Sequence, residues 1–194
     1  MSSLKDRIEH LEGDLIAVPM RIATSHDVPY AVLRYSPTDE WVMRREIRLL
    51  KTRLEAGGKT VVSISLADLL WESIKRSEGL DTVVELERDR GYVEAQSQLA
   101  TYLSDEDWCP LAQLIEESLE GHDPKTTIAF LVRVAAMSPA IYDMSTLLGD
   151  MQVRKIRVPT ILFYPGSLDG TTNLRFMDIK EREALGHYLV KIYG

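Results

Sequence analysis

The sequence predicts an α/β fold, with a mostly parallel sheet of about five strands flanked by helices, of the Rossmann-like or flavodoxin-like kind. Short runs rich in β-branched residues alternate with amphipathic segments along the chain. Strands separated by helices pair in parallel and carry the helices on their faces. The 194 residues, 45% of them hydrophobic, suffice for one core. We therefore expect a single domain over residues 1–194.

The first third of the chain reads as a helix followed by a β-α-β unit. Apolar residues at helical spacing predict the first helix over residues 4–16. A strand over 29–35 leads through Ser36 and Pro37 into a helix with Thr38 as the expected N-cap. That helix should end at Gly57 and Gly58, before a buried strand over 59–66.

The middle of the chain is helical throughout. Four amphipathic segments fill residues from about 67 to 121, separated by Gly79, Gly91 and an acidic run. We interpret them as a helical insertion after the second strand.

The strand pattern then returns. Strands are expected over 126–135 and 158–166, with a helix between them that begins at Ser138, and a last strand within "HYLVKIYG" at 187–194. Numbering the expected strands along the chain, we predict the order 2-1-3-4-5, as in flavodoxin-like sheets.

Composition excludes several classes of protein. The chain shows no apolar leader segment and no run of the ~18 apolar residues that a membrane span needs, so we expect a cytoplasmic protein without membrane contact. The single cysteine, Cys109, cannot form an internal disulfide or start a cysteine-based zinc site. A net charge of -7 argues against wrapping of nucleic acid by the whole surface. Any contact with nucleic acid would have to be made by a local basic surface.

The stretch "ILFYPGSLDGTTNLRF", residues 161–176, could be mistaken for a phosphate-binding loop. A Walker-A loop needs four residues between its glycines and then a lysine, but Gly166 and Gly170 enclose three, and Thr171 stands where lysine is required. Ser167 also lacks the glycine spacing of a nucleophile elbow. We predict a structural turn at the strand end and no cofactor; its residues are Pro165, Gly166, Asp169 and Gly170.

The sequence offers no intact catalytic group. The four histidines are far apart and lie in no metal-binding motif. Cys109 precedes Pro110 at an expected helix start, where the helix dipole would lower the pKa of a thiol. Catalysis would also need a histidine partner that the sequence does not place. We therefore predict that the chain is not an enzyme and holds no catalytic metal.

A concentrated basic face lies on the helix after the first strand. Arg44, Arg48 and Lys51 share one face of this helix, and Arg45 adjoins it. One interpretation is a solvated outer face partly neutralised by nearby glutamates. The other is a site for an anionic partner, either an acidic protein surface or a nucleic-acid backbone.

With these elements in place, the chain resembles the BrxB family of bacteriophage-exclusion (BREX) defence systems. The likeness lies in "PYAVLRYSPTDEWVMRREIRLLKTRLEAGGKTVVSISLADLLWE" (29–72), "VRVAAMSPAIYDMSTLLGDM" (132–151) and "VPTILFYPGSLDGTTNLRFMD" (158–178). Its most specific positions are Pro165, Gly166, Asp169, Gly170, Leu174 and Phe176.

The resemblance implies an α/β protein without known catalysis, in a complex that methylates host DNA and excludes phage. It implies the alkaline-phosphatase-like PglZ subunit as the direct partner, with the methyltransferase and ATPase subunits as further neighbours. We therefore expect a non-catalytic adaptor. Two alternatives stay open: contact with DNA or RNA through the basic helix, and a degenerate nucleotide-binding α/β enzyme.

Overall fold

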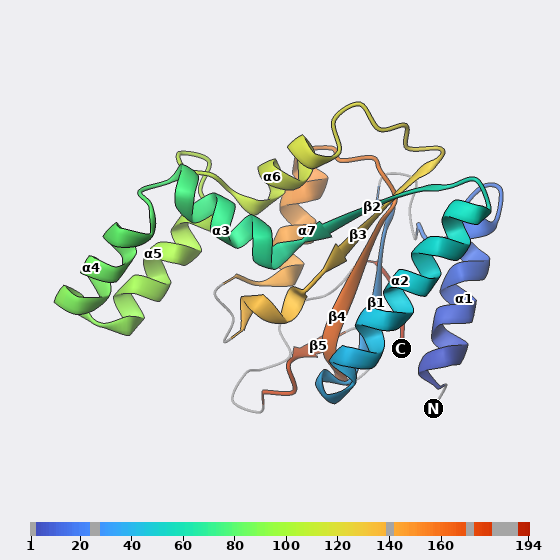
Figure 1. The fold of residues 1–194 in the computed structure, drawn as a ribbon, viewed down its shortest axis with the longest axis horizontal. Coiled ribbons are helices and arrows are strands. Elements are labelled where there is room, and N and C mark those ends of the chain that lie inside the picture. The colour runs from blue at the N-terminus through green and yellow to red at the C-terminus, as the bar shows by residue number, and fades with distance from the viewer. Residues whose placement is uncertain (1–2, 24–27, 139–141, 170–172, 180–189) are drawn as a thin grey trace.

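The computed structural model describes residues 3–23, 28–138, 142–169, 173–179 and 190–194. Their strands form a mostly parallel sheet flanked by helices, which confirms the predicted α/β fold (Figure 1). The strands are β1 (Tyr30–Tyr35), β2 (Thr60–Ser65), β3 (Thr127–Val132), β4 (Thr160–Asp169), β5 (Asn173–Phe176) and β6 (Lys191–Tyr193).

The predicted strand order was wrong. The parallel strands run β2-β3-β4-β1-β6, with β5 pairing antiparallel to β4. β1 thus lies between β4 and β6, where Ala31 pairs with Ile161 on one side and Lys191 on the other. The connection between β1 and β2, which contains a helix of 17 residues, passes over β4 and β3 and so crosses three strand spacings of about 4.8 Å each. A local hydrophobic pattern does not encode such a crossover.

Helices cover both faces of the sheet. On one face, α1 (Leu4–Ile16) and α2 (Glu40–Ala56) pack on alternate strand residues such as Leu33 and Phe163. On the other, α6 (Leu111–Ser118) and α7 (Met144–Val153) pack on Val32 and its neighbours. Because alternate side chains point to opposite faces, both sides of the strands are buried.

Four helices lie between β2 and β3, as expected for the insertion: α3 (Leu66–Arg76), α4 (Leu80–Arg90), α5 (Tyr92–Ser104) and α6. Helices α4 and α5 form an antiparallel pair that projects away from the sheet, and we call this pair the helical arm (Figure 1). A small core of its own, with Ile74, Val83, Ala95 and Tyr102, joins the arm to α3.

Two helices begin later than predicted. Thr38 lies in a 3-10 turn, Pro37–Asp39, and α2 begins at Glu40. Ser138 follows a second 3-10 turn, Val134–Met137, and α7 begins at Met144 after Asp143, whose carboxylate accepts a hydrogen bond from the Ser145 N–H. At the first place a 3-10 turn occupies the position of the expected N-cap, whereas at the second the 3-10 turn ends just before Ser138.

The segment expected to turn at Gly166 instead continues as strand. Pro165 and Gly166 lie in β4, which forms a hairpin with β5 and places Gly166 opposite Phe176. A side chain at Gly166 would lie 2.1 Å from the carbonyl oxygen of Arg175, so glycine permits this close approach. Gly170 and the side chain of Asp169 lie outside the described residues.

Candidate functional site

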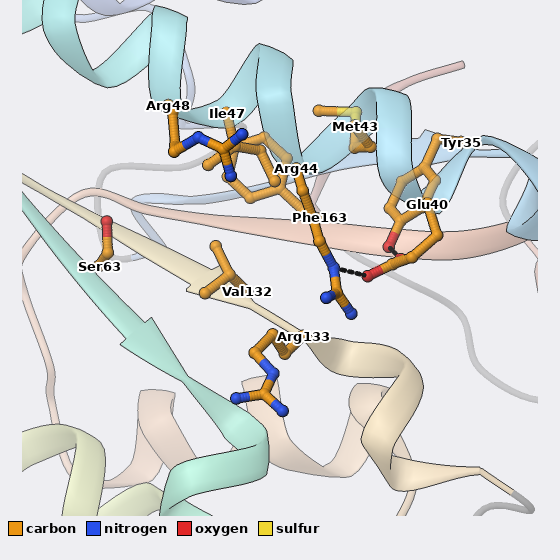
Figure 2. A pocket seen from close by; sticks show the side chains of 10 residues that line it. All are labelled: Tyr35, Glu40, Met43, Arg44, Ile47, Arg48, Ser63, Val132, Arg133 and Phe163. Atoms are coloured by element: carbon orange, nitrogen blue, oxygen red, sulfur yellow. Dashed lines mark hydrogen bonds and ion pairs between the residues drawn. The ribbon is translucent and has the colours of Figure 1, made fainter.

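The candidate site is a hollow of about 240 Å³ between α2 and the carboxyl ends of the parallel strands (Figure 2). Tyr35 and Val132 are the last residues of β1 and β3. Ligands of open α/β sheets bind outside the carboxyl ends of the strands, where neighbouring connections diverge. We call this hollow the arginine groove; it is lined by Tyr35, Glu40, Met43, Arg44, Ile47, Arg48, Ser63, Val132, Arg133 and Phe163.

The topology explains why a groove opens there. After β1 the chain passes into α2, which packs on one face, whereas after β3 it passes toward α7 on the other face. At the end of the groove that β2 and β3 form, the side chain of Val132 is only partly buried and that of Ser63 is exposed. The floor is apolar, because Val132 and Phe163 from the strands meet Met43 and Ile47 from α2.

Three arginines come together around this floor. Arg44 and Arg48 are one turn apart on α2 and share a face of the helix. Arg133 directly follows β3 and has a left-handed backbone, with φ of 58°. In Figure 2 the Arg44 side chain reaches from α2 past Phe163 toward Arg133. A left-handed non-glycine residue costs about 1–2 kcal/mol, and such strain concentrates at functional sites.

Arg44 is held by its neighbours. Its Nε donates a hydrogen bond to Glu40 at 2.8 Å, and its guanidinium carbon lies 4.7 Å from the centre of the Trp41 ring. The Tyr35 hydroxyl donates to the same carboxylate. Burial, together with this bond to Glu40, raises the pKa of Tyr35. Tyr35 therefore stays protonated, and Glu40 fixes both groups.

The other two arginines are less constrained. Arg133 lies 3.2 Å from Asp68, in a pair whose side chains are 49% and 70% exposed and which is hence weak. Among the described residues, no carboxylate pairs with the Arg48 guanidinium. These two side chains are available to an anionic ligand.

The predicted basic face divides into separate environments. Arg44 and Arg48 enter the groove, but Arg45 pairs with Glu46 at 3.0 Å and lines a different hollow toward α1. Lys51 lies beyond the groove and pairs with Glu55 at 3.7 Å. Glu40 and Arg133 were not predicted as site residues from the sequence. The place of Arg133 near the carboxyl end of the strand expected over 126–135 was the signal that could have found it.

The hollow toward α1 is larger, at about 580 Å³, but its geometry favours a structural role. It lies between α1 and α2, away from the strand ends, with Leu4, Ile8 and Val42 in its lining. Across it, Arg53 donates to both carboxylate oxygens of Glu12 at 2.9 Å, and this bond raises the pKa of Arg53. The charged groups there already satisfy each other.

A helix start could have lowered the pKa of the Cys109 thiol, but the pKa is shifted the other way. Cys109 is buried, and burial raises the pKa of its thiol. Burial is the largest contribution, and it outweighs the opposing effect of the nearby Arg76. Over the part of the chain that the structure describes, no group of three or more histidine, cysteine or acidic side chains is placed to hold a metal ion. None of the described helices is both long and apolar enough to span a bilayer.

The fold and groove together define an α/β protein with a cationic hollow at the carboxyl edge of a parallel sheet. The family described as BREX protein BrxB matches residues 62–188, and the chain belongs to that family. The BREX protein BrxB of Bacillus cereus (strain H3081.97) is 22% identical over 160 residues, covering 80% of each chain. No solved structure matches the chain significantly.

Proposed function

We propose that this chain is a non-catalytic adaptor of a BREX anti-phage complex, which docks the PglZ alkaline-phosphatase-like subunit and supports host DNA methylation and phage exclusion. Membership in the BrxB family supports a place in such a system. The methyltransferase and ATPase subunits would be indirect neighbours, and the complex would act in the cytoplasm.

The observation that carries the docking proposal is the apolar surface of the helical arm and the adjoining α3. Trp71 on α3 is 49% exposed, and Tyr92 and Val93 at the start of α5 are 54% and 76% exposed. Tryptophan and tyrosine are the commonest anchors of protein interfaces. Trp108, by contrast, packs on Tyr102 with ring centres 4.9 Å apart and belongs to the core of the arm.

Co-purification tests this proposal. The chain and the PglZ-like protein of its own system, expressed together, should elute as a one-to-one complex in physiological salt. The double variant Tyr92→Ser/Val93→Ser should weaken that complex at least ten-fold, since it removes two exposed apolar side chains. Val153→Ser is the matched control, because Val153 is 80% exposed but lies on α7, away from the arm.

Two results would count against the proposal. Separate elution of the two proteins would remove the direct partner. A strain that lacks this chain yet still methylates its genome and excludes phage would remove the adaptor role altogether.

A second candidate function is contact with DNA or RNA through Arg44, Arg45, Arg48 and Lys51. One observation favours it: Trp41 is 77% exposed beside Arg44, and an exposed aromatic ring next to cations suits a stacked base. Three of the four cations, however, already pair with glutamates. Binding to an oligonucleotide should then fall steeply with salt and disappear on charge reversal at all four positions.

A further inference from the structure

We propose that the arginine groove binds a phosphate monoester of the nucleoside monophosphate class. This inference does not rest on the adaptor function and goes beyond it, because the groove lies at the strand ends and the proposed docking surface lies on the arm and α3.

The net charge of the groove favours a ligand with close to two negative charges. Its lining contains three guanidinium groups and one carboxylate, a net charge of +2. A phosphate monoester carries about -1.5 to -2 charges near pH 7, with three acceptor oxygens. A single carboxylate ligand would leave one cation unmatched. Glu40 does not repel the phosphate strongly, because Arg44 and the Tyr35 hydroxyl already donate to it.

The positions of the three arginines suit them to binding a phosphate group. Arg44 is fixed by Glu40 and Trp41, so little conformational entropy is lost when it binds. Arg133 is held in a left-handed conformation at the end of β3, and its pair with Asp68 is exposed enough to exchange for a ligand. Arg48, which pairs with no carboxylate of the described residues, has no ion pair to give up when a ligand binds. Guanidinium groups bind phosphate oxygens in a bidentate manner.

The size and the floor of the groove define the rest of the ligand. A volume of about 240 Å³ is below the roughly 300–1,000 Å³ of sites that enclose drug-sized molecules, so the groove has room for one nucleotide at most, with part of it left in solvent. Beside the arginines, the partly buried side chains of Ile47 and Val132 offer an apolar surface for a ring, and the exposed Ser63 offers a hydroxyl for a sugar. A single nucleoside with one phosphate matches these features.

Isothermal titration calorimetry with the full chain tests the proposal. AMP and CMP should bind, adenosine should give no heat, and inorganic phosphate should bind at least ten-fold more weakly than AMP. Arg48→Gln and Arg133→Asn should each weaken AMP binding by about ten-fold or more, since each removes charge-assisted hydrogen bonds. Asparagine is chosen at position 133 because it tolerates a left-handed backbone.

Arg45→Gln is the matched control. Arg45 lies on the same helix but outside the groove, so its loss should leave AMP affinity unchanged. Thermal melting of each variant by circular dichroism verifies that it is folded.

Four results would overturn the proposal. The first is no heat with any nucleoside monophosphate at millimolar concentration, and the second is AMP affinity that both groove variants leave unchanged. The third is equal affinity for AMP and inorganic phosphate, which would make the groove a site for free phosphate. Binding of a single-stranded oligonucleotide that needs Arg48, without binding of AMP, would likewise assign the groove to nucleic acid instead.

Discussion

At the scale of single residues, Asp14 of α1 is the most consequential buried charge among the described residues. Its carboxylate accepts hydrogen bonds from Lys191 Nζ at 2.6 Å and from the Tyr193 hydroxyl at 2.7 Å, and His10 Nε2 lies 3.4 Å away. Burial by itself would raise the pKa of Asp14, but these bonds outweigh burial and lower it. Asp14 thus joins the first helix to β6.

Replacing Asp14 should show that its charged carboxylate stabilises the folded protein. Asp14→Asn should lower the free energy of unfolding by about 2 kcal/mol at pH 7, because two bonds to a charged acceptor are lost or weakened. The folded-state pKa of Asp14 lies below its unfolded value of 3.8, so its contribution is present above that pH and lost as the pH falls through the folded pKa.

Urea unfolding at several pH values checks this prediction. The difference between wild type and Asp14→Asn should be full at pH 7 and pH 5 and should shrink near pH 3. Glu9→Gln, an exposed carboxylate on the same helix, is the control and should change stability little. A difference that stays constant down to pH 3 would contradict the assignment.

Gly166 gives a second prediction at this scale. Gly166→Ala should destabilise the protein by about 1–3 kcal/mol, because a side chain would meet the Arg175 carbonyl oxygen and the Tyr164 ring, which lies 2.8 Å away. Gly149→Ala on α7 has open space and should be neutral or stabilising by up to about 1 kcal/mol. Thermal melts of the two variants should therefore move apart, and equal melting temperatures would refute the clash.

At the scale of helices and strands, Ser73 connects three helices. Its buried hydroxyl on α3 donates to the Cys109 carbonyl, just before α6, at 2.7 Å, and lies 3.3 Å from the Tyr102 carbonyl of α5. The loop before α6 and the end of α5 are thereby fixed against α3.

Removing this hydroxyl should loosen the junction. Ser73→Ala should cost about 1–2 kcal/mol, since the Cys109 carbonyl would stay buried without its partner. Ser97→Ala, on the exposed face of α5, should cost almost nothing. Chemical denaturation measures both, and similar losses in the two variants would show that Ser73 has no special role.

The sequence predicted the helices and strands better than it predicted which strands lie side by side in the sheet. The α1 boundaries and the β-α-β unit follow from hydrophobic spacing alone, and the structure confirms them. The hairpin of β4 and β5 was missed because Pro165 and Gly166 are typical turn residues, and only the approach of Arg175 shows why glycine lies within a strand. Of the three arginines of the groove, Arg44 and Arg48 could be predicted from their spacing on one helix. Arg133 joins them through strand pairing, which no local pattern encodes.

At the scale of the whole molecule, the described residues form three hydrophobic clusters, two on the faces of the sheet and one in the arm. The arm cluster is small and centres on Tyr102, whose hydroxyl bonds to Glu78. Burial, together with that bond, raises the pKa of Tyr102 to about 12. Regions with few buried apolar contacts open locally at lower cost than a main core.

Hydrogen exchange should therefore separate the arm from the sheet. Amides of α4 should exchange faster than those of β1 and β4 in the wild-type protein. Tyr102→Ala should accelerate exchange in the arm at least ten-fold and leave β1 nearly unchanged, because it removes the largest fully buried side chain of the arm cluster. Equal acceleration in arm and sheet would show that the two unfold together.

The place of β1 in the sheet also has a consequence for synthesis. On the ribosome, β1 emerges before β4 and β6, yet these late strands supply both of its hydrogen-bonded neighbours. Until they appear, an apolar strand with two open edges stays without its native partners, a state that invites aggregation. Such long-range pairing also slows folding. The nascent chain is thus most vulnerable after β1 has emerged and before β4 has been made.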